Sequence, residues 1–528
     1  MKPWFPVAVC AVLAAACIDH SRAVAPGIRA DLIGGDDHIF DLSSVTTVDP
    51  SLKNQDGNAP PQDGGNPPGP AKNIGPNVVE NQDLTFFPQN ETPIALDPNN
   101  PNRLLSGAND YRHDLAACGI YASSDGGGTW NDVGEGTTVP PGAVAGGDPA
   151  TAFGPDGTGY HVCLGFTPAT NATSTTVVFA SKTTDLKTLR PAGTVIATVL
   201  GGAEPLVGYF NDKEFVTVDT RPMSPHRGRI YVTWTRFKFN RADDRYIESP
   251  IVLSYSDDGG ATWSGPHPVS SPDMNFDQGS VPAVGPNGEV YVVFENGNGT
   301  GFNGQAMVAK SLDGGNTFAH PVRIDAIIEI CDHFNTDGRC ALKNSSWRVN
   351  SFPSIAVGPT GTVYVVWGDY RSGNADVRFS RSTDGGAIWS NSTIVNSDLS
   401  TADQVYPWIA VAENGVVQVE FQQRDDTPGN RLLNTYLSTS MSGQSFGKQL
   451  LVSSGPTDPN IGFSGTFIGD YNGVAASAHG VHPVWTDARR VVCIATRQCR
   501  KQQDAVGQPA CCSVRATRAL VASLFQVQ

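Results

Sequence analysis

The chain has 528 residues, of which 39% are hydrophobic, and this is enough to bury one large core or two medium ones. Its formal net charge of −15 argues against nucleic acid as a partner, because binding phosphates needs a basic face. The same charge would repel an anionic sugar, unless arginines reverse the field locally. Short runs of Val, Ile, Tyr, Phe and Trp are separated by 57 glycines and 38 prolines, which predicts an all-β fold.

The first 25 residues are typical of an export signal. Lys2 precedes an apolar stretch at residues 7–16, and residues 23–25 offer a cleavage site between small side chains. The alternative is a bacterial lipoprotein box at residues 14–17, in which Cys17 carries a lipid anchor. No later stretch has the roughly 20 apolar residues that a transmembrane helix needs. We therefore predict a secreted protein, or one anchored by lipid at the cell surface.

Residues 26–85 form a second region of different composition. From about residue 49 to residue 81 the chain consists mostly of Pro, Gly, Asn, Gln and Asp, with almost no aromatic side chains. Such a segment cannot bury enough apolar surface to fold, so we predict a largely disordered linker. The remaining residues, 86–528, are predicted to form one domain with a cysteine-rich C-terminal segment.

Eight cysteines follow the signal region, and an even number in an exported chain predicts disulfides. We expect one bond between Cys331 and Cys340, which would close a local loop, and a second between Cys118 and Cys163. The pairing of the last four stays open; they are Cys493, Cys499, Cys511 and Cys512. No Cys-x-x-Cys pair occurs with histidines at ligand spacing, so we predict no metal and no cofactor.

One motif recurs along the chain. It reads SSDGGGTW at residues 123–130, SDDGGATW at 256–263, SLDGGNTF at 311–318 and STDGGAIW at 382–389, with a weakened fifth copy at 439–446. The aspartate can accept hydrogen bonds from the N–H groups of its own turn, glycine supplies a positive φ, and the aromatic residue can pack between sheets. We interpret the motif as a structural hairpin tip and place no catalysis on its four aspartates, Asp125, Asp258, Asp313 and Asp384.

A second repeat overlies the first. Its clearest copies are PSIAVGPTGTVYVVW at residues 353–367 and PAVGPNGEVYVVF at 282–294, and weaker copies begin at residues 93, 149, 214, 407 and 467. Seven starts spaced roughly 50 to 75 residues apart predict the blades of a β-propeller. We favour seven blades over six, with the turn motif between the third and fourth strands. In the blade that begins near Asp148, residues 181–189 take the place of the motif.

In a four-stranded antiparallel blade, the residues before the first strand and after the second lie on the same face. Arginines recur after the second strands, at Arg112, Arg236, Arg371, Arg424 and Arg489, and acidic residues and tyrosines are frequent at both positions. This inventory suits a site for a polar, even anionic, ligand at the axis of the ring. The alternative is structural, because an arginine that recurs in every blade can pair with a carboxylate of the neighbouring blade.

The turn motif resembles the Asp-box, or BNR repeat, of sialidases and of exported sialidase-like β-propeller proteins. Sialidases hold the substrate carboxylate with three arginines, and use a tyrosine nucleophile, a glutamate that activates it and an acid/base aspartate. The arginine motif that sialidases carry in the first blade is absent here, where residues 90–94 read NETPI.

The resemblance implies an exo-glycosidase that acts on a glycan or glycoconjugate at the axial face, and we expect a monomer. The residues that it nominates as catalytic are Glu91, Asp148, Asp212, Glu214, Asp470 and Tyr471. Those that it nominates for substrate binding are Arg112, Arg236, Arg371, Arg489, Lys213 and Tyr370. The alternative function is a non-catalytic propeller that binds carbohydrate or protein.

Overall fold

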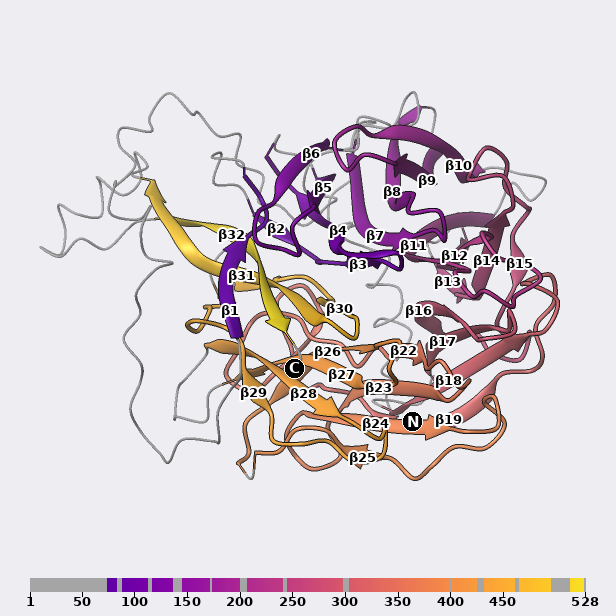
Figure 1. Ribbon diagram of the computed structural model, residues 1–528. Helices are drawn as coiled ribbons and strands as arrows, with labels where there is room; N and C mark the ends of the chain where they lie inside the picture. The colour runs from indigo at the N-terminus through magenta and orange to yellow at the C-terminus, as the bar shows by residue number, and fades with distance from the viewer. Residues whose placement is uncertain are drawn as a thin grey trace, which may run out of the picture.

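The structure is a computed structural model. It describes residues 74–82, 88–112, 116–135, 145–170, 173–199, 207–240, 245–297, 303–398, 400–424, 432–460, 465–494 and 513–526. These residues form seven antiparallel sheets of four or five strands and one two-stranded sheet, and they contain no α-helix. Each of the seven sheets packs against the next and the last packs against the first, so that they form a ring (Figure 1). The chain is thus an all-β propeller with seven blades, which confirms the predicted fold class.

The first three blades come from the N-terminal half. Blade 1 contains β2 (Gln89–Asn90), β3 (Ile94–Asp97), β4 (Asn100–Asp110), β5 (Ala117–Ser123) and β6 (Asn131–Glu135). Blade 2 contains β7 (Ala145–Phe153), β8 (Gly159–Thr170), β9 (Thr173–Thr183) and β10 (Arg190–Val199). Blade 3 contains β11 (Val207–Val218), β12 (Ile230–Asn240), β13 (Arg245–Glu248), β14 (Ile251–Ser256) and β15 (His267–Pro268).

The next three blades follow in chain order. Blade 4 contains β16 (Asp277–Val284), β17 (Val290–Gly297), β18 (Asn303–Ser311) and β19 (Val322–Ile328). The two-stranded sheet, β20 (His333–Phe334) and β21 (Cys340–Ala341), separates it from blade 5. Blade 5 contains β22 (Ser354–Val357), β23 (Val363–Asp369), β24 (Asp376–Ser382) and β25 (Thr393–Ile394). Blade 6 contains β26 (Gln404–Val411), β27 (Val417–Arg424), β28 (Leu433–Ser440) and β29 (Leu450–Leu451).

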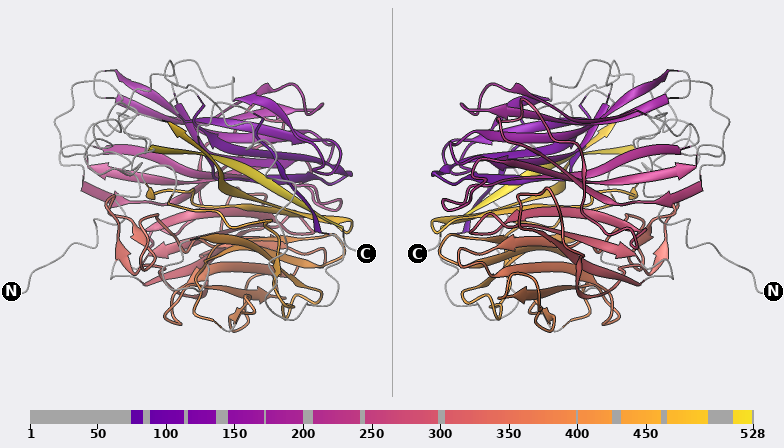
Figure 2. Two further views of the ribbon diagram at one scale, coloured as in Figure 1. Left: turned by 90° about the vertical axis from the view of Figure 1, so that its left-hand side faces the viewer. Right: turned by 90° about the vertical axis from the view of Figure 1, so that its right-hand side faces the viewer.

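Blade 7 closes the ring with strands from both ends of the described chain. It contains β30 (Gly473–Ala476), β31 (Gly480–Ile494) and β32 (Ser513–Gln526), and its outermost strand is β1 (Ile74–Val79). Strand β1 pairs with β32 in antiparallel register, Val79 opposite Val521, and the indigo strand lies beside the yellow one (Figures 1 and 2). Closing the ring in this way leaves no strand of the first or last blade without a partner.

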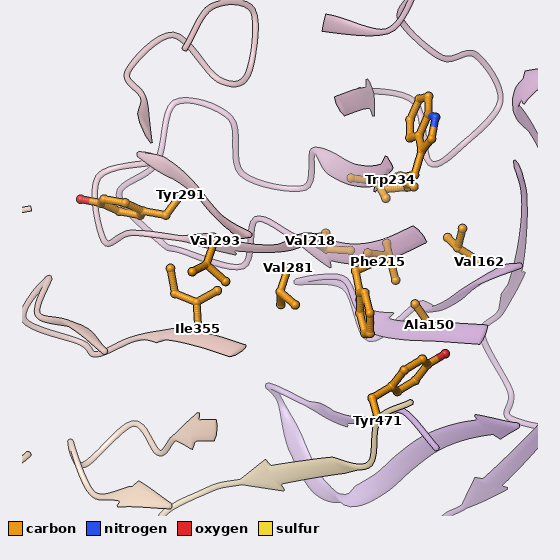
Figure 3. Packing of buried hydrophobic residues seen from close by; sticks show 14 of the residues in the cluster. Ala150, Val162, Phe215, Val218, Trp234, Val281, Tyr291, Val293, Ile355 and Tyr471 are labelled. Atoms are coloured by element: carbon orange, nitrogen blue, oxygen red, sulfur yellow. The ribbon is translucent and has the colours of Figure 1, made fainter. Parts of the chain in front are cut away.

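The core lies between the blades and around the axis. The second strand of a blade is buried on both faces because neighbouring blades cover both, and its tryptophans are buried, as at Trp234, Trp367 and Trp485. Side chains of the innermost strands, among them Phe215 and Val281, meet in one cluster at the axis (Figure 3).

The four repeated motifs form the same turn, between the third and fourth strands as predicted. In the first, the Ser123 hydroxyl donates to Asp125 at 2.8 Å, and the N–H and hydroxyl of Thr129 donate to the same carboxylate at 2.9 and 2.7 Å. The turns at Asp258 and Asp313 repeat all three bonds. The turn at Asp384 lacks only the hydroxyl bond, because isoleucine replaces the threonine. These aspartates therefore hold the turns, as the structural interpretation predicts.

Blade 2 builds an equivalent turn from different residues. Thr183 donates to Asp185 at 3.1 Å, and the N–H of Thr188 donates to the same carboxylate at 2.8 Å. Leu186 has a φ of 57° where the other turns have glycine, and its side chain is buried. Residues 181–189 thus take the place of the motif, as expected.

The two predicted disulfides are present, Cys118–Cys163 between blades 1 and 2 and Cys331–Cys340 at the two-stranded sheet. The export signal, most of the linker, and the side chains of the four C-terminal cysteines lie outside the described residues. Within the described residues, no helix is long and apolar enough to cross a membrane.

Candidate active site at the propeller axis

The innermost strands share an irregularity that turns side chains toward the axis. In β7, β11, β16 and β26 the register shifts by a bulge near the start of the strand. The bulge carries a residue with positive φ, namely Asp148 at 54°, Lys213 at 52°, Gly279 at 68° and Tyr406 at 54°. Glu91, just before β3, has a φ of 60°. A left-handed conformation is costly for residues other than glycine, and such residues concentrate at functional sites.

Six charged residues from four blades meet at this point, and we call them the axial cluster: Glu91, Asp148, Asp212, Lys213, Glu214 and Asp470. All five carboxyl candidates from the sequence analysis belong to it, together with Lys213. Asp148 and Asp212 are half-buried, whereas the other four are buried.

Asn109, at the end of β4, organises one side of the cluster. Its side-chain amide donates to Glu91 at 2.7 Å, and its side-chain oxygen accepts the N–H of Asp148 at 2.8 Å. The N–H of Lys213 donates to the Asp148 carboxylate at 2.9 Å. Blades 1, 2 and 3 are thereby joined at the axis.

Asp470 pairs with two cations, Lys213 and Arg348, on one side of the cluster. Lys213 Nζ lies 2.8 Å from one of its oxygens, and Arg348 grips both oxygens at 2.8 and 2.9 Å. The N–H of Asp470 donates to Glu91 at 3.1 Å, which links blade 7 to blade 1. Burial opposes ionisation of Asp470, but the charges of Arg348 and Lys213 outweigh it and hold its pKa below the usual range.

The pKa values of Glu91, Asp148 and Asp212 depend on one another. Burial raises the pKa of Glu91 and of Asp212 well above the usual range, and the nearby charge of Asp148 raises both further. Burial would also raise the pKa of Asp148, but the charge of Lys213 and hydrogen bonds from Glu91 and Asp212 lower it. These directions make Asp148 the strongest acid of the three, so that Glu91 and Asp212 hold a proton at higher pH than Asp148 does.

Glu214 is the most enclosed member of the cluster. Its side chain is 0% exposed, and neither carboxyl oxygen accepts a hydrogen bond from another residue in the described part of the chain. Burial raises its pKa well above the usual range, and the charge of Asp148 adds to this effect. Glu214 thus holds its proton to higher pH than a glutamic acid in water.

A pocket beside the cluster is lined by aromatic side chains. Phe215, Phe352, Tyr406, Trp408 and Tyr471 form its walls, together with Lys213, Asp470 and Asn350. Lys213 Nζ lies 5.5 Å from the ring centre of Phe352 and 5.3 Å from that of Tyr471. Gly279 makes room for Phe352, because a Cβ at this position would lie 2.6 Å from its ring.

Tyr471 is placed as a wall of the pocket. Its ring centre lies 5.0 Å from that of Phe215, with 64° between the ring planes, and Figure 3 shows the two side chains next to each other. Its hydroxyl donates to the main-chain carbonyl of Pro149 at 2.8 Å, and burial raises its pKa well above the usual range. A nucleophilic tyrosine needs a base on its hydroxyl, and the bond to a carbonyl supplies none.

Three of the strand-end arginines pair with an aspartate of their own blade, and two of these also contact the preceding blade or the residues next to it. Arg112, Arg371 and Arg489 each pair with an aspartate two positions earlier in the chain, Asp110, Asp369 and Asp487 respectively. Arg371 also reaches Asp325 of blade 4, and Arg489 reaches Ser454 next to blade 6. The expected convergence of three arginines on one sugar is therefore not found, and the structural interpretation describes these side chains better.

Two further predicted residues also lie apart from the cluster. The guanidinium of Arg236 lies 5.6 Å from the ring centre of Trp234 and donates to Asn211 at 3.4 Å. Tyr370 is half-buried and packs against the apolar cluster that contains Trp347 and Leu342.

The sequence analysis missed several residues of the site. Phe352 and Tyr406 stand directly before a proline at the start of a blade, as Asp148 does, and this shared position was a usable signal. Arg348 and Asn350 come from the connection between β19 and β22, outside both repeats, so no periodicity points to them. Asn350 donates to the carbonyl of Asp470 at 2.9 Å.

Comparison with known proteins leaves the family open. No family model matches the sequence, and no curated protein matches it. The structure is similar to an α-L-arabinanase of Penicillium chrysogenum complexed with arabinobiose, with 16% identity over 70% of this chain and 98% of that one, at a TM-score of 0.44. It is similar to a protein of unknown function from Dyadobacter fermentans, with 16% identity over 68% and 97%, at 0.42. It is also similar to the NanB sialidase of Streptococcus pneumoniae, with 11% identity over 87% and 71%, at 0.39.

Proposed function

We propose that the protein is an exported glycoside hydrolase whose active site is the axial cluster. The observation that carries the proposal is that Asp148 and the segment Asp212–Lys213 lie together at the bulges of β7 and β11, next to an aromatic-lined pocket, with the pKa of Asp148 lowered and that of Asp212 raised. Two carboxyl groups whose surroundings drive their pKa values apart are the acid and base that glycoside hydrolysis requires. Aromatic walls suit the apolar faces of a sugar ring.

The roles follow from protonation and access. Asp212 is neutral and half-buried, so it acts as the general acid that protonates the leaving oxygen. Asp148 is ionised and half-buried, and acts on the anomeric carbon, directly or through water. Glu91 and Glu214 are buried and influence the pKa values of the two aspartates, while Tyr471 lines the pocket.

The substrate is proposed to be a glycan without a carboxylate at the bound sugar. Both cations nearest the pocket, Lys213 and Arg348, are already paired with Asp470. The three strand-end arginines that would hold an acidic sugar are paired elsewhere. A sialidase specificity is therefore not part of the proposal, whereas export is supported by the two disulfides.

A panel of chromogenic glycosides tests the proposal, with neutral hexosides, pentofuranosides and a sialoside in parallel. We expect turnover of at least one neutral glycoside, with the configuration of the product followed by NMR. Asp148→Asn and Asp212→Asn should each lower kcat/KM by about 10²–10⁴-fold. Glu413→Gln, an exposed acid outside the cluster, is the matched control and should change nothing. Turnover that survives both cluster substitutions would remove the site from the mechanism.

A non-catalytic carbohydrate-binding propeller is the second candidate function. The observation that favours it is that the cluster also locks the ring, since Asp470 and Tyr471 of blade 7 bond to Glu91 and Pro149 of blades 1 and 2. On this alternative a glycan array shows binding, and prolonged incubation releases no product.

A further inference from the structure

Two glycines stand directly before Asp148, at the start of β7. Gly147 still pairs with Leu164 of β8, but the register shifts between Gly147 and Ala150, so Asp148 falls in the bulge. Asp148 has a φ of 54°, which a residue other than glycine adopts only at a cost in free energy. The preceding glycines give the backbone extra freedom and cannot fix this conformation themselves. The conformation of Asp148 is therefore imposed by its surroundings.

The Cys118–Cys163 disulfide packs against this segment. Cys118 Sγ lies 3.3 Å from the carbonyl oxygen of Gly147, and Cys163 Sγ lies 3.6 Å from the same oxygen. The backbone of Gly146 is equally close, since a Cβ added there would lie 3.1 Å from Cys163 Sγ. Both cysteines are buried. The disulfide thus contacts the peptide group that joins Gly147 to Asp148.

The same disulfide adjoins the groups of blade 1 that bond to this segment. Cys118 stands opposite Asn109 in the pairing of β4 with β5. The side-chain oxygen of Asn109 accepts the N–H of Asp148 at 2.8 Å. Two residues before Cys118, the carbonyl of Ala116 accepts the N–H of Gly146 at 2.7 Å. One covalent bond and two hydrogen bonds therefore join the start of β7 to blade 1, and the covalent bond has the most restricted geometry of the three.

We propose that the Cys118–Cys163 disulfide is a positioning element of the site, which holds the peptide group before Asp148 against blade 1 and so sets the direction of the Asp148 carboxylate. The side chains that act on this carboxylate are those of Glu91, Asp212 and Lys213. The inference rests on the proposed function for the catalytic role of Asp148. A displacement of about 1 Å in such a group costs on the order of 10²-fold in rate.

Hydrogen exchange followed by mass spectrometry tests the proposal without any need for activity. The test variant is Cys118→Ser/Cys163→Ser, and Cys331→Ser/Cys340→Ser, which removes the other disulfide, is the matched control. We expect the amides of β7 to exchange at least about tenfold faster in the test variant, and at the wild-type rate in the control. The amides of blade 5 in the same samples report any loss of stability of the whole ring. If the serine variant does not fold, Cys118→Ala/Cys163→Ala, which buries no hydroxyl, replaces it.

The pH profile of hydrolysis supplies a readout that a purely structural disulfide would not change. In the test variant kcat should fall by about 10²-fold while KM stays within a few-fold of wild type. The acid limb of kcat/KM should move to higher pH, because Asp148 loses part of its hydrogen bond from the N–H of Lys213, and such a bond favours the ionised carboxylate. The control variant should keep the acid limb of the wild type.

The proposal is overturned if β7 exchanges no faster than blade 5 in the test variant, or if an active test variant keeps the acid limb of the wild type. Faster exchange confined to β7, in a protein that hydrolyses no glycoside, would support the hold on Asp148 and remove the hydrolase. Hydrolysis by a wild-type protein whose test variant shows unchanged exchange would keep the hydrolase and remove the positioning role.

Discussion

The protein uses carboxylates in two opposite ways, in the outer turns and at the axis. Hydrogen bonds from the side chain and the N–H of Thr262 lower the pKa of Asp258 to about 2, and this residue is exposed. At the axis, burial and the neighbouring charge of Asp148 keep Asp212 neutral. A turn aspartate thus accepts hydrogen bonds within its own hairpin as a carboxylate, whereas an axial carboxyl with a raised pKa holds a proton that it can donate. Repetition marks the structural residues, and departure from it marks the candidate site.

Exchanging the carboxylate at one place or the other should separate activity from stability. Asp212→Asn removes the proposed acid and should lower kcat/KM by about 10²–10⁴-fold, while thermal unfolding shows no loss of stability. Asp313→Ala removes the bonds to Ser311 and Thr317 and should lower the melting temperature while kcat/KM stays at the wild-type value. Equal losses of activity in the two variants would show that the axial carboxyls act only through folding.

The contrast also explains what could be predicted from the sequence. The turns and blades recur along the chain, so each copy supports the prediction of the others. The two disulfides join cysteines that lie close in the sequence or in successive repeats. The carboxyl candidates could be named because they stand before or at the start of the first strands and depart there from the repeat, and their catalytic role stays a prediction. The arginines misled because Asp110, Asp369 and Asp487 stand two residues before them, a pairing that the sequence displays but that recurrence alone does not weigh. Arg348 could not be predicted, since it enters the site from a connection with no counterpart in the other blades.

Removing the cluster's lysine should produce the largest stability effect. Lys213→Met leaves Asp470 with one fewer cation and removes the charge that keeps Asp148 ionised. Breaking a buried ion pair from one side costs about 3–5 kcal/mol, measured by chemical denaturation. Lys310→Met is the matched control, because Lys310 contacts the carbonyl of Gly385 at the turn of the next blade and the ring of Tyr291, not a buried carboxylate. A comparable loss in both variants would contradict the special role of the axial pair.

A buried acid away from the axis tests whether burial alone produces the shift. Burial raises the pKa of Glu80 to about 8, with a hydrogen bond from Ser106 opposing it. The folded protein therefore holds this proton between pH 4.5 and 8, whereas the unfolded chain releases it, so stability falls as pH rises through that window. The loss is at most about 1.4 kcal/mol per pH unit. Glu80→Gln should flatten the pH dependence of urea unfolding relative to wild type and Glu413→Gln, and an unchanged slope would refute the shift.

The smallest expected effect concerns Tyr471, and it discriminates between two mechanisms. Tyr471→Phe removes only the hydroxyl that bonds to Pro149, because the phenyl ring keeps its contact with Phe215. Stability should fall by about 1 kcal/mol, the net value of one hydrogen bond. Glycoside turnover should stay within a few-fold of wild type, since the proposed mechanism assigns the chemistry to carboxyl groups. If Tyr471 is the nucleophile, turnover should instead vanish while the fold remains. This result would favour a sialidase-like mechanism, in which the carboxyl groups of the cluster activate the Tyr471 hydroxyl and do not act on the sugar directly.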